Sequence, residues 1–167
     1  RSVDGRAGYR PAKPKAPEID SDVTGRELDS ATSRQLRALE SRNAATVAKH
    51  LVMTGRYLEL DPQFALEHAV AASRSAGRIS AVREAVGVAA YVAEDYELAL
   101  RELRTHRRIS GSLDHLALLV DCERALNRIS KALDMIEEAK REELPAQVRV
   151  ELAIVESGIY ADQGKKS

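Results

Sequence analysis

The chain has 167 residues, which is enough for one domain with a sizeable core. Its 26 Lys and Arg residues balance its 26 Asp and Glu residues, so bulk charge indicates neither a nucleic-acid-binding protein nor a protein for acidic ligands. With one Phe, five Tyr and no Trp, the composition also argues against an aromatic platform for single-stranded nucleic acid.

The cysteine content and the hydropathy pattern bear on the compartment. Cys122 is the only cysteine, which rules out an internal disulfide and fits a reducing environment. No apolar run approaches the length of a membrane span, and no signal peptide is recognisable. We therefore expect a cytoplasmic protein that makes no contact with a membrane. The chain starts at Arg1 instead of Met, so we expect it to be a fragment of a longer protein.

Residues 1–20 differ in composition from the rest of the chain. They contain three Pro, two Gly and several basic residues, with almost no large apolar side chains. Such a segment cannot bury enough surface to offset the entropy cost of ordering. The sequence predicts a disordered basic tail over residues 1–20 and a helical domain over residues 21–167. An arm that binds RNA or an acidic ligand is the alternative interpretation of the tail.

Helix signals recur along the rest of the chain. Thr24 and Glu27 have the spacing of a capping box and predict a first helix that runs to about Leu39. Asp61 and Pro62 are typical of a helix cap and a first helical residue. Further signals of this kind predict antiparallel helix hairpins near residues 43–77, 80–109 and 113–140 and a last helix over 145–163, about eight helices in all.

The stretch from residue 81 to residue 108 has two apolar helical faces that are joined by a short break at Glu94 and Asp95. Small residues gather where the two helices would meet, which favours a tight antiparallel hairpin. Its Ala99-Leu100 pair recurs 34 residues earlier and 33 residues later. The recurring pairs are Ala65-Leu66 and Ala132-Leu133. This period predicts a repeat protein built from helix hairpins.

The same stretch resembles a tetratricopeptide repeat. Gly87, Tyr91, Asp95-Tyr96 and Ala99-Leu100 take the small, aromatic, turn and alanine positions of that family, and Glu94 stands where the family prefers Gly. The resemblance implies an all-α fold in which antiparallel hairpins stack into a right-handed α-solenoid with a concave surface.

A closer resemblance is to a group of small actinobacterial tetratricopeptide-repeat proteins. It is carried by DVTGRELD at 22–29, VAKHLVMTGR at 47–56, DPQFALEHA at 61–69, VREAVGVAAY at 82–91, ALRELRTHRRISGS at 99–112 and DCERAL at 121–126. That group often has an Arg/Gly-rich N-terminal region, of which residues 1–20 look like the end. The resemblance implies a cytoplasmic scaffold without established chemistry.

The resemblance also places certain side chains on the concave groove. By register these are His50, Thr54, Tyr57, Glu84, Val88, Tyr91, Ala117, Asp121 and Arg124. The tyrosines could anchor a ligand and the charged groups could give it specificity. Such a groove suits an extended peptide or a helix of an unidentified protein. We therefore interpret the chain as a protein-protein interaction scaffold. The alternative is that these polar groups only solvate an empty groove.

A basic cluster on one predicted helix supports a different class of function. It consists of Arg101, Arg104, Arg107 and Arg108. Glu97 and Glu102 offer nearby partners, so a solvated convex face is the favoured interpretation. The alternative is an RNA-associated protein that uses this cluster together with the basic tail.

No residue pattern indicates a metal, a cofactor or catalysis. His115 and Cys122 are seven residues apart and could share a helix face, but a structural zinc site needs four ligands at recognisable spacing. Neither a glycine-rich phosphate loop nor a positioned acid-base pair is visible. We expect no metal, no cofactor and no enzymatic activity.

The last predicted helix has two apolar stripes. The first consists of Val148, Leu152, Val155 and Ile159 and is expected to pack on the helix around Leu133 and Ile136. The second consists of Val150, Ile154 and Ala161 and has no partner within the sequence. Two explanations stay open: either the natural chain continues, or this face forms a two-fold contact in a homodimer.

Overall fold

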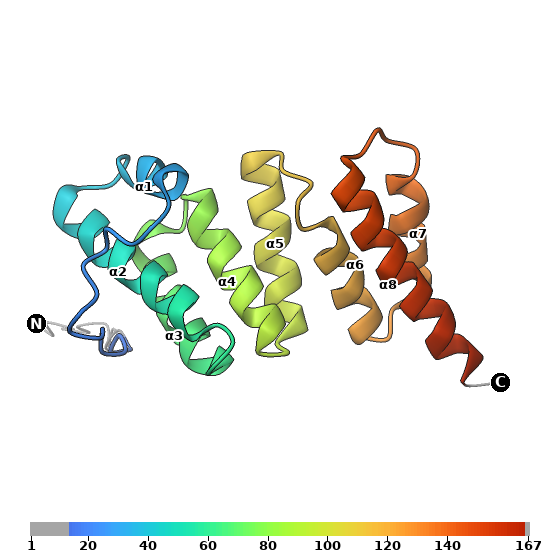
Figure 1. Ribbon diagram of the computed structural model, residues 1–167, viewed down its shortest axis with the longest axis horizontal. Coiled ribbons are helices and arrows are strands. Elements are labelled where there is room, and N and C mark those ends of the chain that lie inside the picture. The colour runs from blue at the N-terminus through green and yellow to red at the C-terminus, as the bar shows by residue number, and fades with distance from the viewer. Residues whose placement is uncertain (1–13, 166–167) are drawn as a thin grey trace, which may run out of the picture.

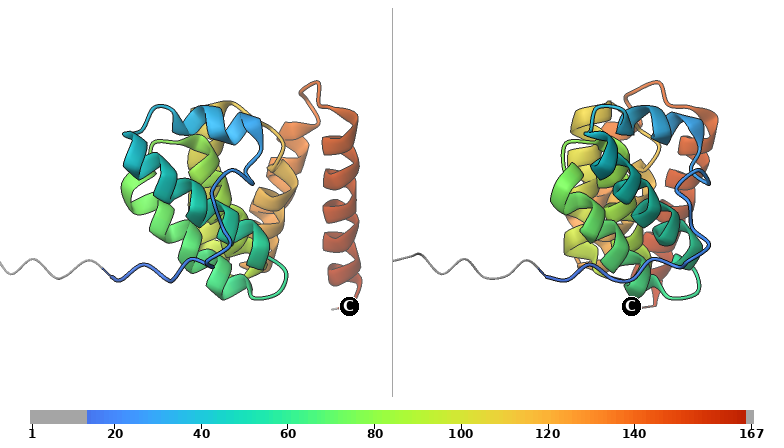
Figure 2. Two further views of the ribbon diagram at one scale, coloured as in Figure 1. Left: turned by 60° about the vertical axis from the view of Figure 1, so that its left-hand side comes forward. Right: turned by 90° about the vertical axis from the view of Figure 1, so that its left-hand side faces the viewer.

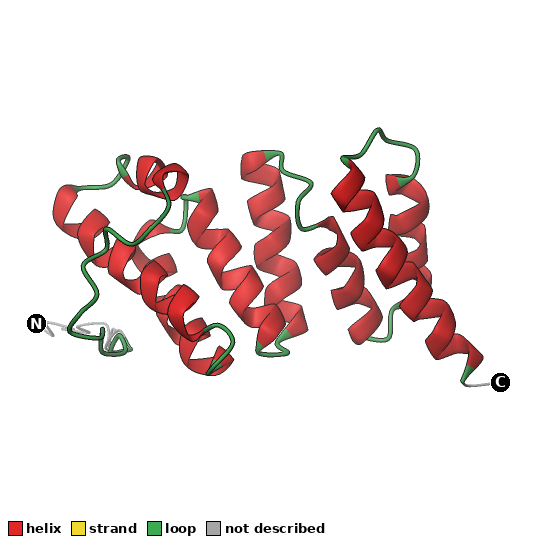
Figure 3. Ribbon diagram, viewed as in Figure 1, coloured by secondary structure: helices red, strands yellow, loops and turns green. Residues whose placement is uncertain are grey.

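The computed structural model describes residues 14–165, and within that range it contains eight α-helices and no β-strand (Figure 3). The all-helical class expected from the sequence is confirmed. The helices are α1 Ser30–Leu36, α2 Ser41–Tyr57, α3 Pro62–Ala76, α4 Ser80–Val92, α5 Tyr96–Ser110, α6 Leu116–Ala125, α7 Ile129–Ala139 and α8 Ala146–Gly164. Figure 1 shows them in a row that follows the chain, with α1 and α2 at one end of the row and α7 and α8 at the other.

The cap predicted at Asp61 is confirmed, and a second helix start is capped in the same way. Asp61 accepts a hydrogen bond from the amide of Phe64 at 3.1 Å, and Pro62 is the first residue of α3. Asp95 caps α5 in the same way through the amide of Leu98. A short acidic side chain at this position accepts from an amide that has no partner inside the helix. These caps fix where the second helix of each of the two hairpins begins.

The first helix is shorter than predicted. Glu27 does accept a hydrogen bond from the amide of Thr24, at 3.0 Å, as a capping box requires. However, Gly25 has a φ of 89°, a left-handed conformation that cannot continue a right-handed helix from Thr24. The helix instead begins at Ser30, where Asp29 caps the amide of Thr32 at 3.0 Å.

The start of α4 is capped by a side chain from another helix. Ser80 is the first helical residue, and the preceding Ile79 offers no side-chain cap. Gln35 of α1 supplies the acceptor: its Oε1 lies 3.0 Å from the amide nitrogen of Ala81 and 3.0 Å from the hydroxyl oxygen of Ser80. The short α1 is thereby tied to the helix that carries several candidate site residues.

Two of the helix-helix turns have the same backbone geometry. Glu94, between α4 and α5, has a φ of 63°, and Asn127, between α6 and α7, has a φ of 60°. In both turns the next amide donates to the carbonyl five residues earlier, at 2.8 Å. This is the pattern of a left-handed helix terminator followed by a longer hydrogen bond. The three alanines of the repeated Ala-Leu pairs, Ala65, Ala99 and Ala132, are all fully buried.

The centre of the molecule depends on a close approach of α4 and α5. Gly87 of α4 faces Leu103 of α5, and a Cβ at Gly87 would lie only 2.6 Å from the Leu103 Cγ. The two helices can therefore approach closely only because this position has no side chain. Arg83 adds a polar link, since it donates to the carbonyl of Gly77 and lies 2.8 Å from the buried carboxylate of Glu102.

The segment that precedes α1 lies against α2 and α3. Asp20 accepts hydrogen bonds from Arg56 at 3.0 Å and from the hydroxyl of Tyr57 at 2.8 Å, and Arg74 donates to the carbonyl of Pro14. The expected boundary between tail and domain, at residues 20 and 21, thus falls inside a segment that contacts the helices. The rest of the predicted tail, residues 1–13, lies outside the described residues.

Two histidines share the interior of the first hairpin. The Nδ1 atoms of His50 on α2 and His68 on α3 lie 2.9 Å apart, so one ring donates its proton to the other. Both side chains are buried. Burial lowers the pKa of His50 to about 4, and the neighbouring His68 and Arg74 add to the effect. Burial also lowers the pKa of His68.

The last helix packs on α6 and α7 at the end of the row, as the left view of Figure 2 shows. Val148, Leu152 and Ile159 of its first predicted stripe are buried in the core. On the opposite stripe, the exposed fractions are 58% for Val150 and 66% for Ile154. Within residues 14–165, none of the helices combines the length and the apolar character that crossing a membrane requires.

We expect Gly87→Ala to lower the free energy of unfolding by roughly 1–3 kcal/mol, because its methyl group would overlap Leu103. The matched control is Gly55→Ala in α2, where no atom lies within 4 Å of the added Cβ. Alanine favours a helix over glycine by about 1 kcal/mol, so Gly55→Ala should raise the stability. Urea unfolding measures both, and equal shifts in the two variants would contradict the close approach.

The buried histidine pair predicts a loss of stability in mild acid. The unfolded chain binds a proton at His50 near its ordinary pKa of 6.5, whereas the folded chain binds one only near 4. The neutral His50 therefore contributes fully to the free energy of unfolding above pH 6.5. This contribution is lost as the pH falls toward 4, at up to about 1.4 kcal/mol per pH unit for one proton. His50→Asn should flatten this slope. Urea unfolding in neutral and mildly acidic buffer measures it, and identical slopes would contradict the prediction.

Candidate functional site

A cleft of ≈ 630 Å³ lies between α4, α6 and α8. Its apolar wall is formed mainly by Tyr91, Ala117, Leu118, Val148, Ile154 and Val155. Its carboxylates are Asp114, Asp121 and Glu151, and His115 is the one basic side chain among the described residues that line it. The cleft therefore combines an apolar surface with an acidic rim.

The position of α8 beside this cleft is set by a chain of polar contacts. The hydroxyl of Tyr91 on α4 donates to Asp121 on α6, and burial and this hydrogen bond raise the pKa of Tyr91. Arg124 lies 3.4 Å from Asp121 and 2.6 Å from Asp162 on α8. Gly158 leaves room for the guanidinium, because a Cβ there would lie 2.5 Å from it. Asp121 and Arg124 of α6 thus link α4 to α8 across the cleft.

The structure separates the residues that the sequence predicted to share one groove. Tyr91, Ala117 and Asp121 line the large cleft. Thr54, Glu84 and Val88 instead line a second cleft of ≈ 210 Å³ between α1, α2 and α4. Arg124 stands beside the large cleft, where Asp121 and Asp162 hold it.

Two of the expected groove residues lie elsewhere. His50 is buried against His68 between α2 and α3. The ring of Tyr57 packs edge-on against Phe64 with centroids 4.9 Å apart, and its hydroxyl donates to Asp20. These two side chains thus differ from the register carried over from the repeat family, because His50 faces α3 within the hairpin and Tyr57 is engaged by Phe64 and Asp20.

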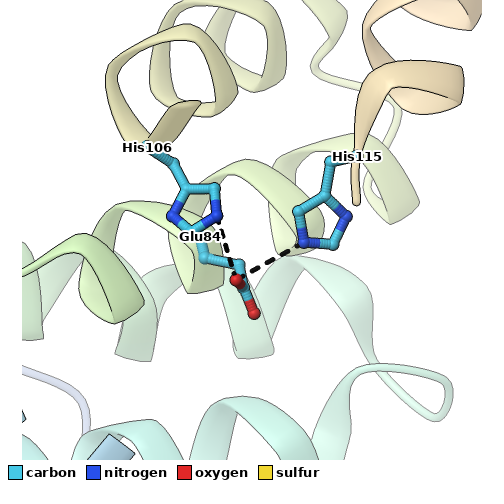
Figure 4. Close-up of side chains that lie close together, drawn as sticks. All are labelled: Glu84, His106 and His115. Atoms are coloured by element: carbon cyan, nitrogen blue, oxygen red, sulfur yellow. Dashed lines mark ion pairs between the residues drawn. The ribbon is translucent and has the colours of Figure 1, made fainter. Parts of the chain in front are cut away.

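Three side chains that the sequence did not associate converge between the two clefts. Glu84 of α4, His106 of α5 and His115 at the start of α6 face one another (Figure 4). The Oε2 of Glu84 lies 3.2 Å from the Nε2 of His106 and 3.5 Å from the Nε2 of His115. Hydrogen bonding between Glu84 and His115 raises the pKa of His115 and lowers that of Glu84. Since the three residues come from three helices, no spacing in the sequence indicates the cluster.

The basic cluster on α5 is partly neutralised. Arg104 lies 2.8 Å from Glu123, and Arg101 lies 3.4 Å from Glu102. Glu97 does not pair with Arg101 as its spacing suggested, because Arg128 lies 2.6 Å from it. Within residues 14–165 no carboxylate forms an ion pair with the two remaining arginines, Arg107 and Arg108.

Glu123 is a charged group in the interior of α6. Its side chain is fully buried, and three cations surround it: Arg104 at 2.8 Å, and Arg128 and Lys131 at 3.6 Å. A buried carboxylate is tolerated only when such partners offset its loss of hydration. Arg104 therefore has a structural role that its place in a basic cluster did not indicate.

The single cysteine is part of the core. Cys122 is fully buried, and burial raises the pKa of its thiol to about 12. Because the thiolate is the nucleophilic and metal-binding form, this thiol is inert near neutral pH. His115 and Cys122 do not form a site together, since His115 faces Glu84 instead.

Comparison with known proteins gives no family for the chain: no protein-family model, no curated protein and no solved structure matches it.

We expect Arg104→Ala to lower the free energy of unfolding by roughly 1–3 kcal/mol, because it leaves the buried Glu123 without its nearest partner. Arg101→Ala removes the same charge from the same helix, but Arg101 is exposed and its loss should cost less than about 0.5 kcal/mol. Urea unfolding of the two variants measures the difference. Equal losses would show that Glu123 does not depend on Arg104.

Proposed function

We propose that the chain is a non-enzymatic protein-protein interaction scaffold that binds a helix or an extended peptide in the cleft between α4, α6 and α8. The observation that carries the proposal is the lining of that cleft, in which apolar side chains from three helices meet at a concave surface. Concave apolar surfaces with a few polar groups are the usual form of a binding site. In a helical scaffold such a groove suits an amphipathic helix or a peptide.

The charges of the cleft favour a basic ligand segment. Asp121 is partly neutralised by Tyr91 and Arg124. Asp114 and Glu151 are partnered by neither arginine nor lysine among the described residues. A segment with apolar anchors and flanking Lys or Arg would match this arrangement, since charge complementarity at an interface rim favours one partner over another.

The proposal includes the arrangement of the hairpins. The two equivalent turns at Glu94 and Asn127 and the buried alanines Ala65, Ala99 and Ala132 support stacked repeats of one kind. We propose that the hairpins form a right-handed solenoid like that of tetratricopeptide-repeat proteins of actinobacteria. We also propose that the protein acts in the cytoplasm. A homodimer through the exposed face of α8, at Val150 and Ile154, stays a prediction.

RNA binding through α5 is the weaker candidate. Two of its four arginines, Arg101 and Arg104, form ion pairs with glutamates of the same fold. By itself the remaining pair, Arg107 and Arg108, is too small a patch to supply the several phosphate contacts on which nucleic-acid affinity depends. RNA binding would therefore also need the basic tail, most of which, residues 1–13, lies outside the described residues. We therefore favour peptide binding in the cleft over RNA binding.

Selection of peptides from a random display library on the immobilised chain tests the proposal. We expect apolar peptides that carry Lys or Arg. Tyr91→Ala and Glu151→Lys should weaken their binding roughly tenfold or more, because the first removes an apolar wall and the second reverses a rim charge. Fluorescence anisotropy of labelled peptides measures the change.

The matched control is Glu143→Lys, which makes the same charge reversal at an exposed residue outside the cleft. It should leave peptide affinity unchanged. Equal binding by wild type and Glu151→Lys would remove the cleft from consideration. Salt-sensitive RNA binding that Arg107→Ala and Arg108→Ala abolish, in the absence of peptide binding, would favour the alternative instead.

A further inference from the structure

We propose that Glu84, His106 and His115 form a binding site for a divalent transition-metal ion, of which zinc is the expected one. The site goes beyond the proposed function: His115 also lines the cleft, but the three ligands belong to this chain and need no bound peptide. It is built from one carboxylate oxygen and two imidazole nitrogens, and all three atoms lie within 4.8 Å of one another. Two histidines and one glutamate are an established ligand set for zinc.

The state of His106 is fixed by the backbone of α4. Its Nδ1 lies 2.9 Å from the carbonyl oxygen of Ser80, and a carbonyl can only accept a hydrogen bond. The proton of the neutral ring is therefore on Nδ1, and the lone pair is on Nε2. Histidines that ligate metals have this arrangement, in which the second nitrogen donates to a backbone carbonyl or a carboxylate and thereby orients the ring.

The Nε2 of His106 is aimed into the cluster and has no hydrogen-bond partner. The residue is only 5% exposed, so water does not compensate for this. Its neighbour at 3.2 Å, the Oε2 of Glu84, is also an acceptor. Two acceptors at this distance repel each other unless a positive charge lies between them. Either a second proton on an imidazole or a metal ion supplies that charge.

The distances between the three ligand atoms match those found around a bound zinc ion. In tetrahedral zinc sites with Zn–N near 2.0–2.1 Å and Zn–O near 2.0–2.2 Å, neighbouring ligand atoms lie roughly 3.3 Å apart. The three ligand atoms form a triangle. Its two edges from the Oε2 of Glu84 to the Nε2 atoms of His106 and His115 are 3.2 and 3.5 Å long. The third edge joins one ring nitrogen of His106 to one ring nitrogen of His115 and is at most 4.8 Å long. His115 is partly exposed, so a small rotation of its ring shortens that edge without disturbing the core.

An ion can reach the cluster from solvent. The side chain of Glu84 is 45% exposed and borders the small cleft, while His115 borders the large one. Three protein ligands leave one position of a tetrahedral ion for water or for a group of a bound partner. The ion would join α4 and α5 to the start of α6, across the turn that contains Gly111.

Titration of the whole chain with Zn²⁺ at neutral pH, against a chromophoric chelator as competitor, tests the site. We expect one equivalent to bind and the thermal midpoint to rise, because the folded chain alone presents the three ligands together. Glu84→Gln and His115→Ala should each weaken binding roughly tenfold or more. Cobalt(II) in place of zinc should give the visible absorption of a four-coordinate site in wild type only.

The control is His50→Asn, which removes an imidazole from the buried pair in the first hairpin and should leave zinc affinity unchanged. Glu84→Gln keeps the shape of the side chain, and circular dichroism verifies that the variant folds. Failure of wild type to compete with the chelator would overturn the proposal. So would wild-type affinity in both ligand variants, or loss of binding in His50→Asn alone.

Discussion

The approach of α4 to α5 at Gly87 sets the positions of the side chains on which the rest of the structure depends. Glu84 lies about one helical turn before Gly87 and Tyr91 about one turn after it, so both point from a helix whose distance from α5 is fixed by the absence of a side chain. At one end of α4 this brings Glu84 to His106 of α5, whereas at the other end Tyr91 reaches Asp121 on the next helix, α6. A wider separation of α4 from α5 would break the contact between Glu84 and His106.

Charged groups in the interior join successive helices. Arg83 of α4 reaches the buried Glu102 of α5, and Arg104 of α5 reaches the buried Glu123 of α6, each pair at 2.8 Å. In both pairs the carboxylate is buried and the guanidinium reaches the surface, as expected for a long side chain whose stem packs on apolar neighbours. Because a buried carboxylate requires its partner, these pairs select one packing of neighbouring helices over shifted ones.

The sequence predicts the helices well because their signals are local. Caps such as Asp61 and the apolar period of each helix depend on residues within a few positions. The predicted start of the first helix is wrong because Gly25 adopts a left-handed conformation, which a glycine allows but does not require. The candidate sites depend on contacts between helices. The spacing of His115 and Cys122 allows a shared helix face, yet His115 faces Glu84 in the fold, and no local pattern contains that information.

The cap that Gln35 provides to α4 has a consequence for how the chain becomes structured. With seven residues, α1 is too short to be stable alone, and the first turn of α4 has no side-chain cap of its own. Each element therefore completes the other. Domains generally fold from the N-terminus during synthesis, and here the acceptor lies 46 residues ahead of the amide that needs it. Gln35 is thus synthesised before Ala81, but because α1 is not stable alone, the cap and the start of α4 become ordered together.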